Sequence, residues 1–462
     1  MLAIPYPLKR IVDFYRDREY FRSLRRLALP IIIQQFILSG LNMVNVVLIG
    51  QKGDASVAAV GVVNQVFFLL NLVHFGIISG AAMFTAQFWG KGDIPNLRRV
   101  LGLCLALSIA ASLIFFLFVQ LMPAQILGVY SSDPAVIALG SQYLRIFSWT
   151  FIFFAITFSY ALVLRSTGDV RTPTVISVTA LSLSTLLSYG LIFGKFGLPE
   201  MGLEGAALAA LIARGVECVL LLIVTYAIKS PVAASLTELF NFDLPFLGRV
   251  LKPILPVVLN EIFWALGITS YNVIYGHIGT DAFAAMSIVA TIDQMALVLF
   301  QGIAHATAVM VGNRIGAGEE ESAHLYAGRS LGLGILLGLL VGVILLLLRA
   351  PVLTLYKVTP AVTSAAYRVL TIISLFLWMR FNNMAIVIGI LRSGGDTRFS
   401  LVLDGIIIWV VGVPLSALGA FVFHLPVHWV YLFAMSEETT KWVLGLRRYV
   451  SRKWIHNLAV AA

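Results

Sequence analysis

Two carboxylates that interrupt long apolar runs are the residues of this chain best suited to chemistry. Glu261 and Asp293 both lie in such runs in the second half of the sequence. An ionised carboxylate at bilayer depth is costly unless it is partnered, and for this reason such groups usually serve a function. We expect a cation or proton site that involves Glu261, with Asp293 as its second carboxylate. The alternative role for Glu261 is structural, as a partner of Arg380 or of a backbone group.

Neutral oxygen donors lie in the same half of the chain. Asn382 and Asn383 stand in the tenth apolar run beside Arg380 and could be neutral ligands of the same cation. Asp404 stands only about five residues into the eleventh run, which favours a hydrogen-bonded residue at the membrane surface over a direct role.

A polar stripe marks the first apolar run, and aromatic residues mark the seventh. The spacing of the stripe by three, four and seven or eight positions places it on one helix face, which is too polar for lipid. It should therefore face the other half of the protein or a wet cavity. Aromatic rings could stack on a planar cation. The predicted substrate-cavity residues are Gln34, Gln35, Asn42, Asn45, Trp264 and Tyr271.

The sequence lacks the motifs of several other classes of protein. It contains no Gly-x-x-x-x-Gly-Lys-Ser/Thr phosphate loop, which excludes ATP as an energy source bound by this chain. It also contains no His-Glu-x-x-His, no Gly-x-Ser-x-Gly and no Cys/His cluster with metal-ligand spacing. We therefore expect no enzyme activity and no cofactor or metal, beyond Na⁺ or H⁺ as a transient coupling ion.

The elements that must position these residues are membrane-spanning helices. Hydrophobic residues make up 60% of the chain and charged residues 12%, and a bilayer core demands runs of about 20 apolar residues per helix. The chain is predicted to be all-α and polytopic. The twelve predicted spans are 28–50, 57–80, 97–122, 136–163, 172–194, 204–228, 252–276, 282–311, 325–349, 363–390, 399–423 and 427–447.

The two halves of the chain are copies of one unit. The phrase Leu164–Arg171 returns as Leu391–Arg398 at a separation of 227, and Pro30 and five glycines recur at a separation of 226. In the second register Glu261 corresponds to Gln35 and Asp293 to Phe67. Six spans per half predict two six-helix lobes related by a pseudo-two-fold axis along the membrane normal, as in one class of secondary transporters. The expected parts are a basic amphipathic segment (1–27), an N-lobe (28–228), a linker (229–251), a C-lobe (252–447) and a basic tail (448–462).

The distribution of basic residues predicts the orientation. With a cytoplasmic N-terminus, 24 of the 32 Lys and Arg residues fall in inside segments and five in outside loops. This asymmetry places both termini in the cytoplasm. It also explains the net charge of +10 without a nucleic-acid partner.

Several stretches resemble the multidrug and toxic compound extrusion (MATE) family of bacterial efflux transporters. They are Asn42–Gly61, Thr85–Gly90, Leu255–Ala265 and the Arg-Ser-Gly-Gly-Asp-Thr-Arg phrase. The resemblance implies two lobes around a V-shaped cavity and export of cationic drugs in exchange for Na⁺ or H⁺. It also implies an acidic residue in the first helix, where this chain has Asn45, and a carboxylate in the seventh helix, where it has Glu261. The tenth-helix aspartate of some members is matched only by Asn382 or Asn383.

The predicted function is therefore a secondary antiporter of the bacterial inner membrane that exports cationic amphipathic compounds by alternating access. Its expected partners are small organic cations and the lipid bilayer, and the expected state is a monomer. One alternative is a lipid-linked saccharide flippase of the same superfamily, which would favour a basic cavity. Another is an integral membrane enzyme, for which the chain offers only scattered histidines.

Overall fold

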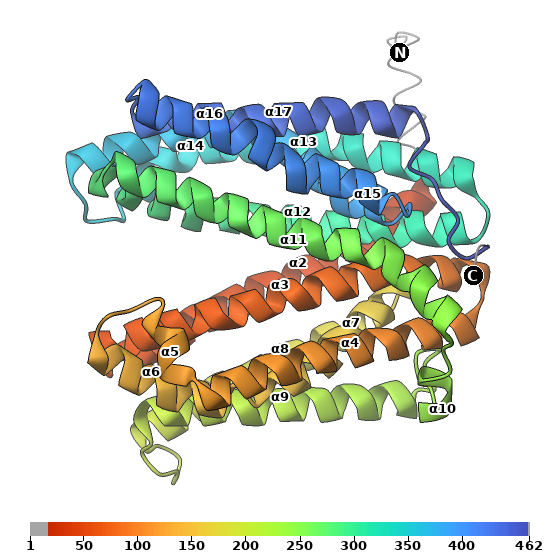
Figure 1. The fold of residues 1–462 in the computed structure, drawn as a ribbon, viewed down its shortest axis with the longest axis horizontal. Helices are drawn as coiled ribbons and strands as arrows, with labels where there is room; N and C mark the ends of the chain where they lie inside the picture. The colour runs from red at the N-terminus through yellow and green to blue at the C-terminus, as the bar shows by residue number, and fades with distance from the viewer. Residues whose placement is uncertain (1–16, 461–462) are drawn as a thin grey trace, which may run out of the picture. The chain divides into compact units, whose positions relative to one another are not determined.

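The computed structural model describes residues 17–460, and within these residues the regular structure is entirely helical, apart from one isolated β-bridge (Figure 1). The chain divides into two compact units. One unit comprises Pro30–Leu251 and is called the N-unit below. The other comprises Met1–Leu29 and Lys252–Ala462 and is called the C-unit.

The helices of the N-unit follow the predicted spans closely. They are α2 (Arg18–Gly50, shared with the C-unit), α3 (Asp54–Lys91), α4 (Ile94–Leu121), α5 (Pro123–Gly128), α6 (Pro134–Phe147), α7 (Thr150–Ser166), α8 (Arg171–Phe193), α9 (Gly202–Ala227) and α10 (Leu236–Leu239). The predicted fourth span is broken, because α6 and α7 meet at an angle of 50°.

The helices of the C-unit repeat this order. They are α11 (Leu244–Ile278), α12 (Thr280–Gly316), α13 (Glu320–Leu353), α14 (Pro360–Met384) with the π-helix η1 (Ala385–Arg392), a composite helix over 397–422, and α17 (Val427–Val450). The composite helix consists of α15 (Thr397–Ser400), η2 (Leu401–Ile406), η3 (Ile408–Gly412), α16 (Val413–Ala417) and η4 (Leu418–Val422).

Among the described residues, ten helices are long and apolar enough to cross a membrane, or eleven if the bent pair α6 and α7 is one span. Helix α17 lies where the twelfth span is predicted but is less apolar. The reason is visible in its sequence, since Glu437, Glu438 and Lys441 interrupt the apolar residues.

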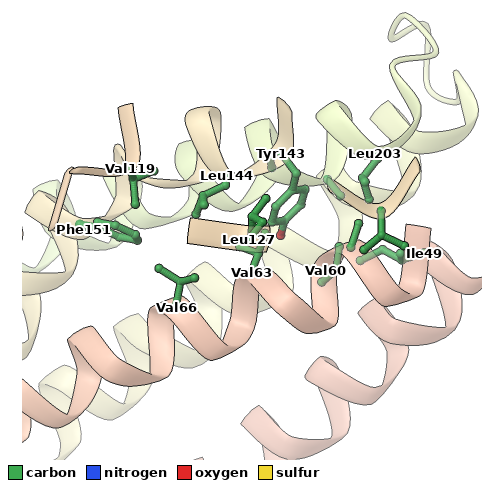
Figure 2. Packing of buried hydrophobic residues seen from close by; sticks show 14 of the residues in the cluster. Ile49, Val60, Val63, Val66, Val119, Leu127, Tyr143, Leu144, Phe151 and Leu203 are labelled. Atoms are coloured by element: carbon green, nitrogen blue, oxygen red, sulfur yellow. The ribbon is translucent and has the colours of Figure 1, made fainter. Parts of the chain in front are cut away.

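A buried hydrophobic cluster holds the N-unit together (Figure 2). Val63 and Val66 of α3 point toward Tyr143 of α6 and Phe151 of α7 in this cluster. Lipid is as apolar as these side chains, so that the cluster is stabilised mainly by close van der Waals packing between the helices. The cluster therefore fixes the broken fourth span against α3.

The N-terminal segment differs from the sequence prediction. Residues 1–27 were predicted to be a basic amphipathic segment separate from the first span, but α2 begins at Arg18 and continues through Pro30 without a break. Tyr20 is fully buried, and its hydroxyl lies 2.9 Å from Ser330 Oγ of α13. Asp17 also pairs with Arg329 at 2.6 Å. Residues 18–27 thus pack against α13 within the C-unit. Residues 1–16 lie outside the described part of the chain.

The linker between the halves packs on α4. Arg98 donates to the carbonyl of Pro231 at 3.0 Å, and a side chain at Gly102 would collide with the backbone of Leu239. Ser235 and Glu238 cap α10 reciprocally. The hydrogen bond from the Ser235 amide lowers the pKa of the Glu238 carboxyl. The linker is therefore held by specific contacts with one helix.

Corresponding residues of the two halves are 226 positions apart at the start of the repeat and 227 apart at the repeated phrase. The tenth span explains this change. Pro134 and Pro360 begin corresponding helices at a separation of 226, whereas Leu164 and Leu391 are separated by 227. One residue has therefore been added between Pro360 and Leu391. A π-helix accommodates such an addition within a helix, and η1 occupies Ala385–Arg392. It ends on the arginine of the repeated phrase.

Candidate functional site

Glu261 and Arg392 form a buried ion pair inside the C-unit. Glu261 lies in the middle of α11 with 7% of its surface exposed, and Arg392 at the end of η1 with 3% exposed. Arg392 Nη2 donates to Glu261 Oε1 at 2.6 Å. The sequence identified Glu261 but treated Arg392 as part of a polar connection. The predicted alternative partner, Arg380, pairs instead with Asp293 at 2.6 Å.

A second group of buried charges surrounds Lys441 of α17. Its ammonium donates to Asp404 at 2.9 Å and to Glu437 at 2.5 Å, and only 2% of the side chain is exposed. Asp404 Oδ2 also accepts from Asn260 Nδ2 at 3.1 Å. The hydroxyl of Tyr271 donates to Glu437. Because Asn260 precedes Glu261 on α11, this group is next to the Glu261–Arg392 pair.

The two asparagines of the tenth span are buried, as a role inside the protein requires. Asn382 donates to the carbonyl of Trp378 at 2.9 Å, and Asn383 donates to Glu438 Oε2 at 2.6 Å. The amide oxygens of Asn382, Asn383 and Asn260 are all buried without a hydrogen-bond partner. A buried acceptor left unsatisfied is unusual in a folded protein and calls for a ligand or water.

The charges of these groups do not balance. Arg380, Arg392 and Lys441 supply three cations, whereas five carboxylates pair with these cations or accept from Asn383 or Tyr271. The five carboxylates are Glu261, Asp293, Asp404, Glu437 and Glu438. This set of side chains therefore has two carboxylates more than it has basic partners.

The N-unit repeats the arginine contact without the carboxylate. Arg165 Nη2 donates to Gln34 Oε1 at 2.9 Å, and Thr174 Oγ1 donates to the same oxygen at 3.1 Å. Gln34 is buried, with 5% of its surface exposed. The register of the sequence placed Gln35 opposite Glu261, but the contact is made by Gln34, one position earlier. Arg165 and Arg392 are 227 positions apart because of the residue added in the tenth span, and Gln34 and Glu261 are also 227 positions apart.

The other predicted cavity residues belong to both units. In the N-unit Gln35 and Asn45 are half-buried and Asn42 is exposed, while Asn45 Oδ1 has no hydrogen-bond partner. In the C-unit Trp264 is half-buried, whereas Tyr271 is buried and belongs to the charged group around Lys441.

Four functional candidates escaped the sequence interpretation, namely Arg392, Glu437, Glu438 and Lys441. Arg392 and Lys441 were counted among the basic residues of the inside segments, but both are buried and ion-paired. The spacing of Glu437 and Lys441 by four residues within the predicted twelfth span was a signal that could have found this pair. Removing these two residues from the 24 basic residues assigned to the inside segments leaves 22 inside against five outside. The charge asymmetry that predicts the orientation is therefore still present.

The fold and this set of buried charges define a polytopic membrane protein built from two related halves, one of which carries an acidic interior. The MatE family model matches the chain twice, over residues 30–190 and 256–418, so the chain belongs to the MatE family. The two matches begin 226 residues apart, which confirms the internal repeat predicted from the sequence.

Two relatives and one solved structure illustrate the similarity. The probable multidrug resistance protein NorM of Thermotoga maritima is 24% identical to this chain. The alignment covers 94% of this chain and 93% of that protein. The probable multidrug resistance protein NorM of Rhizobium meliloti is 29% identical, with 85% of each chain covered. A mutant form of the Vibrio cholerae MATE transporter VcmN superposes with a TM-score of 0.86 at 18% identity, covering 96% of this chain and 99% of that chain. These similarities support a role in multidrug extrusion.

Proposed function

We propose that this protein is a secondary antiporter that exports cationic amphipathic compounds in exchange for Na⁺ or H⁺. The proposal rests on its membership of the MatE family and on relatives named as multidrug resistance proteins. It includes alternating access of the two units and an orientation with both termini in the cytoplasm.

The observation that carries the proposal is the surplus of carboxylates in the C-unit. Five carboxylates accompany three basic side chains, and Glu261 and Glu437 are buried while the other three are half-buried. Charges without partners are costly at low dielectric. A bound cation or proton would remove part of this imbalance. A positively charged drug would do the same in its turn, so that the two ions compete for the same negative charge.

Glu261 is the proposed coupling residue. It lies at the middle of α11 and is held by one guanidinium, so that binding of a cation needs only that Arg392 gives up its contact. Asp293 would share the charge, although Arg380 neutralises it in this structure. Coupling follows if occupancy of Glu261 changes the balance between inward-facing and outward-facing states.

The unsatisfied amide oxygens favour Na⁺ as the coupling ion. Oxygen atoms of carboxylates and carbonyl groups are the ligands that hard cations prefer. Asn260, Asn382 and Asn383 each offer such an oxygen in the C-unit. A proton would need only Glu261, whereas Na⁺ would use these oxygens as well.

Purified protein in sealed vesicles provides the test. We expect a fluorescent organic cation to move against its own gradient when a Na⁺ gradient of the opposite direction is imposed. A proton gradient alone should drive less transport. Movement of the dye that ignores both gradients would contradict antiport, and movement driven only by protons would contradict the choice of Na⁺.

A further inference from the structure

The segment that follows α17 lies on the repeated phrase of the C-unit. Residues 451–460, called the strap below, run past the turn 393–396 that joins η1 to α15, and Figure 1 shows this dark blue segment beside α15. The amide of His456 donates to the carbonyl of Gly394 at 2.8 Å, and Ile455 forms an isolated antiparallel bridge with Gly395. The strap is therefore bonded to the turn through its backbone.

Trp454 anchors the strap. Its side chain is fully buried, and its indole nitrogen donates to the carbonyl of Tyr449 at 3.2 Å. A side chain at Gly394 would collide with the Trp454 ring and carbonyl. Gly395 has a φ of 82°, a conformation that favours glycine, and a Cβ there would also crowd Leu458 and His456.

Further contacts tie the strap and the end of α17 to two neighbouring helices. Arg448 donates to Asp396 at 2.6 Å, and the Tyr449 ring stacks on His324 of α13 with centroids 4.4 Å apart. Asn457 of the strap donates to the carbonyl of Ile315 in α12 at 2.8 Å. The strap and the end of α17 together thus contact α12, α13 and the turn between η1 and α15.

In the first copy of the phrase, nothing among residues 17–460 covers the glycine in this way. Its turn contains Gly168, at which an added Cβ would meet no atom within 4 Å. Of the eight positions of the phrase, Thr167 and Gly394 form one of the two pairs that differ. The contact with Trp454 explains this difference, because only glycine fits beneath the indole. The sequence change and the strap therefore belong together.

The residue before the strapped turn is Arg392. Its guanidinium donates to Glu261 at 2.6 Å, and its carbonyl accepts from the Gly395 amide at 3.0 Å. We propose that the strap is a positioning element for the Glu261–Arg392 pair and thereby sets the affinity of Glu261 for the coupling cation. This inference rests on the proposed function of Glu261.

The direction of the effect follows from competition. Arg392 and the coupling cation bind the same carboxylate, so that a well-held Arg392 weakens the binding of the cation. Asp404, Lys441 and Asn260 lie beside this pair and are bonded to one another rather than to the strap. Release of the strap should therefore increase the affinity for the cation.

The test compares substitutions in the strap with substitutions in the turn 393–396 that it contacts, all made in the full-length protein. Trp454→Ala removes the anchor, Gly394→Thr introduces the residue of the first copy, and His456→Pro removes the amide donor together with the imidazole side chain. The matched control is Thr167→Gly, which makes the reciprocal change in the first copy. The readout is the cation concentration that half-saturates gradient-driven transport of an organic cation in vesicles.

We expect the three strap variants to lower this concentration by about fivefold or more, a typical coupling between two sites, and Thr167→Gly to leave it unchanged. Labelling of a cysteine introduced at Ile455 reports whether the strap has been released. An unchanged concentration in a folded variant with a released strap would overturn the inference. If Glu261 is not the coupling residue, Glu261→Gln with an intact strap would still show normal coupled transport. This result differs from the result that would overturn the role of the strap.

Discussion

Arg392 reaches Glu261 at 2.6 Å in the second half of the chain, and the corresponding contact in the first half ends on a neutral amide. There Arg165 donates to Gln34 at 2.9 Å. One repeated contact thus has a carboxylate in one copy and a carboxamide in the other. Two copies of one fold have become chemically different at this position, and the acidic copy is the candidate for cation coupling.

This relationship predicts the effect of a carboxylate in the first copy. Gln34→Glu should stabilise the protein modestly, because a carboxylate at this buried position would pair with the Arg165 cation while the cost of desolvating the new charge offsets much of the gain. Thermal unfolding in detergent measures the change. Gln35→Glu is the matched control, since the sequence register alone would pair that position with Glu261. Stabilisation by Gln35→Glu and not by Gln34→Glu would refute the equivalence of the two contacts.

Lys441 should be the most sensitive basic residue of the C-unit. Its ammonium lies between Asp404 and Glu437 and is almost fully buried. Lys441→Met leaves two buried carboxylates without their cation, which should cost about 3–5 kcal/mol. We expect loss of the folded protein in a thermal unfolding assay. Neutralising both carboxylates in the same variant, with Asp404→Asn and Glu437→Gln, should recover most of the stability; no recovery would indicate that Lys441 acts by packing alone.

Gly412 should tolerate no side chain. A Cβ at this position would overlap the Tyr271 hydroxyl and Glu437 Oε2, which are hydrogen-bonded to each other. Gly412→Ala should therefore destabilise the protein by about 1–3 kcal/mol, the usual cost of an overpacked interior. Gly61→Ala is the control, because an added Cβ there meets no atom within 4 Å. Equal unfolding temperatures for the two variants would show that the Tyr271–Glu437 contact is not fixed.

The orientation can be checked by labelling a single cysteine. Thr167 and Gly394 occupy corresponding positions of the repeated phrase, but Gly394 is buried beneath Trp454 and is therefore unsuitable for labelling. Thr167→Cys and the exposed Lys453→Cys should react with impermeant reagents only from the cytoplasmic side. Labelling of either cysteine from outside intact cells would contradict the predicted topology.

The sequence predicted the helices well because hydrophobic length and the repeat are local properties. The spans beginning near residues 97, 172 and 204 were placed within three residues of the helix starts, and the family matches confirm the repeat. The break between α6 and α7 was missed, since the bend at Ser148 and Trp149 contains neither proline nor glycine. The continuous start of α2 was also missed, because the burial of Tyr20 depends on contacts with α13.

The candidate site was only partly predictable for a related reason. Glu261, Asp293 and the two asparagines are conspicuous in apolar runs, and burial of Glu261 and of both asparagines agrees with roles inside the protein. Their partners could not be assigned, since Arg392 is 131 residues from Glu261 and follows a π-helix that no sequence pattern announces. Lys441 and Arg392 looked like surface residues because they lie near other basic residues.

Gradient-driven efflux by Glu261→Gln in sealed vesicles tests the central claim most directly. The variant should fold, because Arg392 would then face an amide, as Arg165 already faces Gln34 in the first half. We predict that the variant inserts into the membrane and binds the organic cation normally. It should no longer export this cation when a Na⁺ or proton gradient is imposed. Asp293→Asn, assayed in parallel, should reduce efflux less. Near-normal gradient-driven efflux by Glu261→Gln would contradict the assignment of coupling to Glu261.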